Sequence, residues 1–221
     1  MKKILVTLLI LVAVVGAVSA SDGRIGVSVA PEWYWLDTGT DSKSGQTNLA
    51  FMAEGAHYFG KRGSGIGIEY GLGAYFPLNT WVGDADPVKV PDDTPSNFIF
   101  KVGAGYRYEF SDLLGLSAGV GMRGKFGTIV DTGLDFGDIF MASGKTTNFR
   151  LDIYGDVSLD ITLLEFLRIN VGVILGGPVY SSFTTKSSSS GIFGDHNNTT
   201  TGTIDESGFW LAPVIAVSYT Y

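Results

Sequence analysis

Apolar side chains recur at every second position from residue 23 to the end of the chain. The segment 97–110 shows the pattern most clearly. One set of alternate positions holds Phe98, Phe100, Val102, Ala104, Tyr106, Tyr108 and Phe110, and the other holds Ile99, Lys101, Gly103, Gly105, Arg107 and Glu109. Successive side chains of a β-strand point to opposite faces of its sheet. The pattern therefore predicts a strand with one apolar, aromatic face and one face that is charged or small.

Eight segments share this alternation: 23–37, 47–59, 65–77, 97–110, 115–126, 148–160, 166–180 and 208–221. Each is long enough to cross a bilayer as a tilted strand of about 9–11 residues. Short connections (60–64, 111–114 and 161–165) alternate with long ones (38–46, 78–96, 127–147 and 181–207). We therefore predict an all-β fold, an eight-stranded antiparallel up-and-down transmembrane β-barrel with its short turns at one end.

The aromatic residues of the apolar faces gather at two depths. Near the short turns lie Phe59, Tyr106, Tyr108, Phe110, Phe166, Tyr219 and Tyr221, and near the long connections lie Trp33, Trp35, Phe76, Phe98, Phe100, Phe126, Phe149 and Phe209. Amphipathic rings favour the two interfaces of a membrane, which gives transmembrane barrels two aromatic girdles. Pro31, Pro178 and Pro213 fall inside predicted strands, where we expect β-bulges to accommodate them.

The last predicted strand carries the most specific local signal. It alternates through Pro213, Ile215, Val217, Tyr219 and Tyr221, and it ends on an aromatic residue. Together with the eight segments, it resembles the small eight-stranded outer-membrane β-barrels, such as OmpX, OmpW and the transmembrane domain of OmpA. The resemblance implies the outer membrane of a diderm bacterium, with contact to outer-membrane lipid. It also implies that the barrel assembly machinery recognises the strand ending at Tyr221.

The first residues predict export. Met1-Lys2-Lys3 precedes an apolar run over 4–15, and Val18-Ser19-Ala20 follows. A basic start, a short apolar run and small residues at alternate positions are typical of a cleaved signal peptide. We therefore expect a signal peptide over 1–20 and the barrel domain over 21–221.

The composition excludes several kinds of functional site. The chain has no cysteine and two histidines, and its formal charge is −7. These counts exclude disulfides and multi-histidine metal centres, and the acidic balance argues against nucleic-acid binding. We predict no cofactor and no metal site.

Two patterns found in enzymes do not fit the predicted strands. Gly119-Val-Gly-Met-Arg-Gly124 has the glycine spacing of a dinucleotide-binding turn but lies within a predicted strand, where no helix follows it. Some barrels of the resembling group are lipid A deacylases with a histidine and a serine two residues apart. Tyr58 and Phe59 follow His57, so that pattern is missing. We expect the chain not to be an enzyme.

Charged residues of both signs occupy the inward positions of the predicted barrel. They are Glu32, Glu54, Glu69, Glu109, Asp152, Asp156 and Asp160, with Lys101, Arg107, Arg123, Lys125, Arg150 and Arg168. The interior of an eight-stranded barrel is just wide enough for side chains, and unpaired buried charge is very costly. We therefore predict a paired lumen network. It either plugs the barrel or lines a narrow polar path.

Two long connections are distinctive. The segment 184–203 is rich in Ser, Thr, Asn and Gly, so we expect it to be mobile. The segment 127–147 carries Ile129, Leu134, Phe136, Ile139 and Phe140, which would not normally face water as a group. These residues either fold over the mouth, admit small hydrophobic solutes, or contact a partner.

Two functions from different classes therefore remain. One is an OmpW-like diffusion barrel for small or hydrophobic solutes. The other is a plugged barrel that acts as an adhesin or structural surface protein, with a host or surface partner bound through its long extracellular loops.

Overall fold

The computed structural model describes residues 23–37, 43–60, 64–83, 85–90, 97–129, 134–135, 140–191 and 196–221. The predicted signal peptide lies outside these ranges. No helix long and apolar enough to cross a membrane occurs among the described residues.

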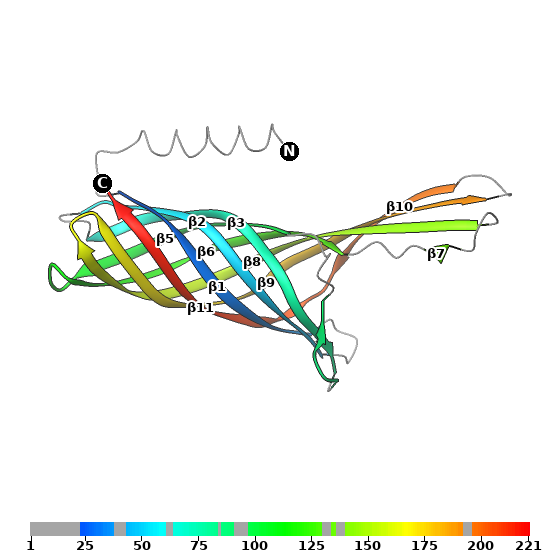
Figure 1. Cartoon of the computed structure of the whole chain (residues 1–221), viewed down its shortest axis with the longest axis horizontal. Helices are drawn as coiled ribbons and strands as arrows, with labels where there is room; N and C mark the ends of the chain where they lie inside the picture. Colours follow the sequence, from blue (N-terminus) through cyan, green and yellow to red (C-terminus); the bar gives the residue numbers. More distant parts are fainter. Residues whose placement is uncertain are drawn as a thin grey trace.

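Eight long strands dominate the described part of the chain. They are β1 (Gly23–Asp37), β2 (Lys43–Tyr58), β3 (Gly65–Val82), β5 (Asn97–Glu109), β6 (Leu114–Ile129), β8 (Phe140–Leu164), β9 (Leu167–Gly191) and β11 (Ser207–Thr220). Each pairs with its neighbours antiparallel, β11 pairs with β1, and β9 pairs with both β8 and β11, so the eight close into a ring. The predicted up-and-down architecture is confirmed (Figure 1).

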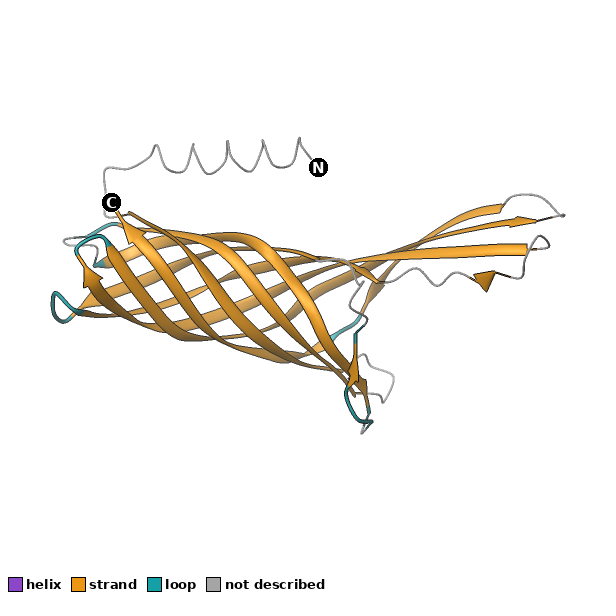
Figure 2. Cartoon of the chain, viewed as in Figure 1, coloured by secondary structure: helices purple, strands orange, loops and turns teal. Residues whose placement is uncertain are grey.

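Three shorter strands add to the ring at its long-loop end. β4 (Val88–Lys89) pairs with β3, β7 (Leu134–Asp135) pairs with β8, and β10 (His196–Ile204) pairs with β9. Figure 2 shows that strands make up nearly all of the described chain.

The two faces of the wall differ as the alternation predicts. Outward side chains such as Val120 and Ile153 are exposed, whereas inward ones such as Glu32 and Asp152 are fully buried. Outward aromatic rings pack together at both depths: Trp35 on Phe209, Phe126 on Phe149, Tyr108 on Phe110, and Phe166 on Tyr219. A wall with an apolar outer face and two aromatic bands suits a bilayer.

One proline sits at a bulge, as expected. The pairing of β8 with β9 shifts between Leu151 and Asp152, which face Tyr180 and Pro178, so Val179 is the extra residue of β9. The bulge reverses the phase of β9 and turns the side chain of Ser181 inward, where it is buried.

The prediction of bulges at Pro31 and Pro213 is wrong, because the β1–β11 ladder shows no register shift there. The ladder between β1 and β11 keeps one register but is interrupted over residues 30–32 of β1. The flanking pairs are Val29↔Ile215 and Trp33↔Leu211. Pro31 therefore lies opposite Pro213. Neither proline nitrogen carries a hydrogen, so two backbone hydrogen-bond donors are missing at the same place in the β1–β11 ladder. We call this interruption the proline seam.

The described residues of 184–203, which the composition predicts to be mobile, form strands. β9 continues to Gly191, and β10 runs beside it from His196. Threonine explains the order because β-branched side chains favour strands. Hydroxyls bond across the strands, as between Thr146 Oγ1 and Thr185 Oγ1 at 3.0 Å. β8, β9 and β10 thus extend past the barrel rim as a narrow projecting sheet (Figure 1).

Candidate functional site: the barrel interior

The interior at the short-turn end is filled by an inner ion-pair cluster. Its charged members are Arg24, Glu54, Glu69, Lys101, Arg107, Glu109, Asp156, Asp160 and Arg168. Every one comes from an inward position of a wall strand. The cluster joins β1, β2, β3, β5, β8 and β9 across the lumen, so it ties distant strands together as well as neighbours.

Asp160 is the centre of this cluster. It is fully buried and accepts hydrogen bonds from Arg107 Nε at 2.6 Å and from Arg24 Nη1 at 3.4 Å. Asn170 and Ser117 donate to it as well. A buried carboxylate is stable only when its lone pairs are filled in this way.

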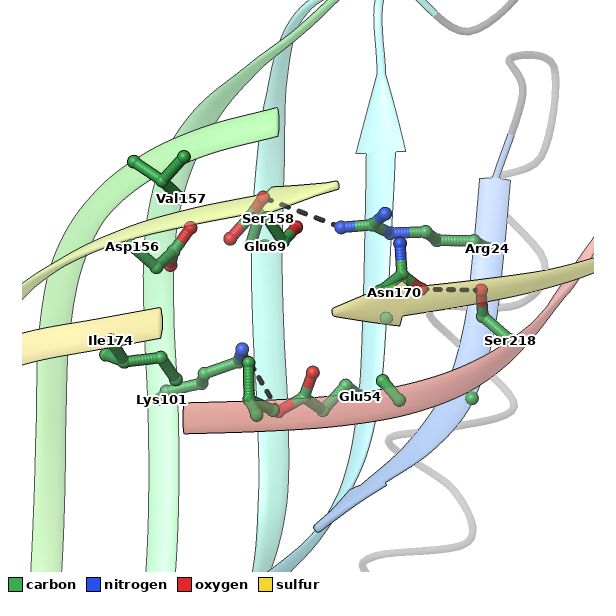
Figure 3. Close-up of a pocket in the computed structure, with 14 residues that line it drawn as sticks. Arg24, Glu54, Glu69, Lys101, Asp156, Val157, Ser158, Asn170, Ile174 and Ser218 are labelled. Carbon is green, nitrogen blue, oxygen red and sulfur yellow. Dashed lines mark hydrogen bonds and ion pairs between the residues drawn. The ribbon is translucent and has the colours of Figure 1, made fainter. Parts of the chain in front are cut away.

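A small cavity lies beside the inner cluster (Figure 3). Its volume is about 50 Å³, and its lining includes Glu54, Lys101 and Asp156. Lys101 Nζ lies 3.1 Å from Glu54 Oε1 and closes one side. Since one water molecule needs roughly 10–15 Å³ of such space, the cavity has room for a few waters.

The interior at the long-loop end holds an outer ion-pair cluster. Its members are Glu32, Arg123, Lys125, Arg150 and Asp152. Glu32 accepts from Arg123 and, at 2.6 Å, from Lys125 Nζ. Arg150 Nε lies 2.9 Å from Asp152 Oδ1.

Aromatic rings complete the outer cluster. Arg123 lies over the Trp210 ring at 4.3 Å, and Arg150 lies over the Tyr34 ring at the same distance. Lys125 Nζ is 4.1 Å from the Tyr34 ring centre and 4.5 Å from that of Tyr75. Cation–π contacts of desolvated charges are worth about 2 kcal/mol each, so the rings both fill space and hold the cations.

A buried apolar layer lies beside the outer cluster, and the sequence analysis did not predict it. Its residues are Ala30, Ala50, Met52, Ile99, Ile174 and Ala212, all buried and packed against the outer aromatic rings. Along β1, Ala30 stands between Arg24 and Glu32, and along β9, Ile174 stands between Asn170 and Ser181. On β5 and β6, Lys101 of the inner cluster pairs directly with Arg123 of the outer cluster. The sequence does contain a signal for this layer, because Met52, Ile99 and Ile174 occupy inward positions among polar residues.

The predicted lumen residues all lie in the interior, and they divide between the two clusters. Asp156 lines the small cavity, and its Oδ2 atom, like the Nε atoms of Arg123 and Arg168, has no hydrogen-bond partner. Arg24 was missed, although it shares the inward phase of Ser28 and Glu32. Of the predicted apolar loop residues, Phe136 and Ile139 lie outside the described residues, as do the side chains of Ile129, Leu134 and Phe140.

The arrangement closes the lumen rather than lining a pore. Tyr34 and Trp210 of the outer cluster and Ile99 and Ala212 of the apolar layer have no exposed surface. Nor are three or more carboxylate or histidine side chains of the described residues grouped so as to bind a metal ion.

Comparison with known proteins places the fold. No family model matches the chain, and no curated protein matches it. A major outer membrane protein from Thermus thermophilus is similar in structure, with a TM-score of 0.52 at 12% identity over 90% of this chain and 99% of that one. This chain has the fold of the small outer-membrane β-barrels.

Two further solved barrels are more distant. OprG from Pseudomonas aeruginosa gives a TM-score of 0.49 at 18% identity, covering 91% of this chain and 96% of that one. Ail, the attachment invasion locus protein of Yersinia pestis, gives 0.40 at 9% identity, covering 90% and 99%.

Replacing Asp160 with alanine tests the inner cluster of this outer-membrane-type barrel. The change leaves Arg107 and Arg24 buried without their shared carboxylate, so we expect a loss of about 3–5 kcal/mol in the free energy of unfolding. Denaturant titration in lipid vesicles measures it. Asp112→Ala, in an exposed turn, should change stability by less than about 0.5 kcal/mol. Equal stabilities of the two variants would contradict the buried network.

Proposed function

We propose that this chain is an outer-membrane protein of a diderm bacterium whose closed barrel anchors a surface-recognition sheet. The projecting sheet of β8, β9 and β10 carries the proposal. From Ser181 to Gly191, β9 rises by roughly 30 Å at about 3.3 Å per residue. That reach takes the sheet well beyond the aromatic band at the long-loop end, where Phe149 packs near Tyr180.

The described surface of the projecting sheet suits recognition. Asn197, Asn198, Thr199 and Thr200 of β10 are exposed, and their side chains offer amide and hydroxyl groups. Within the described ranges β10 pairs with β9 alone, which leaves its other edge open. An open strand edge presents unpaired backbone donors and acceptors, which a partner can use.

The closed interior supports an anchoring role. Two ion-pair clusters and an apolar layer fill the lumen, which gives the barrel the rigidity of a packed core rather than a path for solutes. Such a barrel holds a projecting sheet in a fixed direction.

Shortening the sheet tests this function. Replacing 186–199 with Asn-Gly keeps the Thr185↔Thr200 pair and closes it with a two-residue turn that favours hairpins. Cells of a non-adherent bacterium that express the shortened variant should lose binding to host cells or matrix-coated surfaces. The full chain and the Asp112→Ala variant should bind. Equal adhesion by the shortened variant, with a heat-shifted gel band to verify folding, would remove the proposal.

The proline seam favours a second candidate, an OmpW-like lateral route for small hydrophobic solutes. Pro31 and Pro213 interrupt the β1–β11 ladder, and the small buried side chains of Ala30 and Ala212 lie beside them on the lumen side. The apolar layer is therefore separated from the bilayer by the weakest part of the wall. Such a route would connect lumen and lipid without an aqueous pore.

Restoring the ladder tests the lateral route. Pro31→Val with Pro213→Val supplies two backbone donors, each worth about 0.5–1.5 kcal/mol, and should reduce the uptake of N-phenylnaphthylamine by several-fold. Val27→Ile, whose partner Val217 lies in the intact part of the ladder, is the matched control. If both variants take up the dye as the parent chain does, the seam is not a route.

A further inference from the structure

A second cavity lies at the long-loop end of the lumen, at the foot of the projecting sheet. Its volume is about 50 Å³. Polar side chains from several strands line it, among them Gln46, Asn48, Lys125, Asn148, Arg150 and Ser181, and Glu206 completes the wall. Among these, the sequence analysis placed only Lys125 and Arg150 in the predicted lumen network. We call this space the mouth cavity.

Two irregularities of the wall shape the mouth cavity. The β2–β3 register shifts between Thr47 and Asn48, where Asn48 faces Pro77. On the other side, the bulge at Val179 turns Ser181 inward. Bulges commonly re-aim side chains next to functional sites, and here both flank one cavity.

Asn48 is the informative residue. Its side chain is 1% exposed, it lines the cavity, and its Oδ1 atom has no hydrogen-bond partner. Asn148 also lines the cavity with an Oδ1 that lacks a partner. A buried polar atom without a partner costs about 1–3 kcal/mol, so both oxygens are available to accept hydrogen bonds from a molecule in the cavity.

The charges around the mouth cavity are balanced. Within the described residues, Arg123, Lys125 and Arg150 are offset by Glu32 and Asp152 of the outer cluster and by Glu206, which accepts a hydrogen bond from Ser181 at 2.6 Å. An ionic ligand would upset this balance. A neutral ligand that both donates and accepts hydrogen bonds would match the amides and the hydroxyl.

We propose that the mouth cavity binds a sugar, by the hydroxyl groups along one edge of its ring. Hydroxyls donate to the amide oxygens of Asn48 and Asn148 and accept from the spare donors of Lys125 and Arg150. The cavity holds the volume of a few water molecules, which matches two or three hydroxyls rather than a whole ring. The rest of the glycan extends along the projecting sheet.

This assignment rests on the proposed surface-recognition function and specifies its ligand as a glycan. The mouth cavity can be tested independently of the projecting sheet, because replacing 186–199 leaves its lining residues Ser181, Glu206 and the two asparagines in place. Sugar binding and cell adhesion can therefore fail separately.

The experiment measures binding of methyl glycosides of glucose, galactose and N-acetylglucosamine to the full chain. Saturation-transfer NMR and calorimetry are done in phosphocholine micelles, since glycoside detergents would compete. We expect at least one glycoside to bind, with affinity reduced about tenfold or more by Asn48→Leu. Asn79→Leu is the matched control, because Asn79 lies at the same bulge but bonds to Thr47, away from the cavity.

The outcomes separate clearly, with heat-dependent gel mobility used to verify that each variant is folded. No glycoside binding to the full chain, or equal binding by Asn48→Leu, would overturn the proposal. Binding of glycine in place of glycosides would overturn the sugar assignment. If the chain with 186–199 replaced keeps both glycoside binding and adhesion, sugar binding by the mouth cavity is supported and surface recognition by the projecting sheet is contradicted. If the full chain binds cells but no glycoside, surface recognition by the projecting sheet is supported and sugar binding by the mouth cavity is contradicted.

Discussion

The structure depends on one constraint, the narrowness of a closed ring of eight strands. Such a ring leaves room inside only for its own side chains, so each inward charge must find its counter-charge within the lumen. Asp160 shows the result, with Arg107, Arg24 and two neutral donors around one carboxylate. The pairing joins strands that are not neighbours in the wall and so gives the barrel a core.

The constraint also explains how the interior is layered. Charges gather in two clusters where arginine and lysine side chains reach across the lumen, and small or aliphatic residues such as Ala30 and Ile99 pack against the aromatic rings of the outer cluster. The outer cluster uses rings as well as carboxylates, since Trp210 and Tyr34 lie beneath guanidinium groups. Within the described residues, the ladder between β1 and β11 is interrupted at the proline seam, and the mouth cavity is lined in part by the outer cluster. The recognition and sugar-binding proposals therefore concern the same end of the barrel.

Much of this architecture could be predicted from a period of two. The phase of each strand places Glu32, Arg107 and Asp152 inside and the aromatic residues outside, because a closed wall has only two faces. Other features escaped besides Arg24 and the apolar layer. The opposition of Pro31 and Pro213 depends on the register between the first and last long strands, which no local pattern encodes. The order of the projecting sheet was obscured by its Ser-rich and Asn-rich composition, although its threonines favour strands. Asn48 looked ordinary because the bulge that faces it is visible only in the pairing.

The central claim is that the barrel interior is closed, and conductance in planar bilayers tests it most directly. The refolded chain should insert, show its heat-shifted gel band, and leave the bilayer silent at all salt concentrations. Discrete conductance steps that rise with salt would contradict the account, because they require an aqueous path through both ion-pair clusters and the apolar layer.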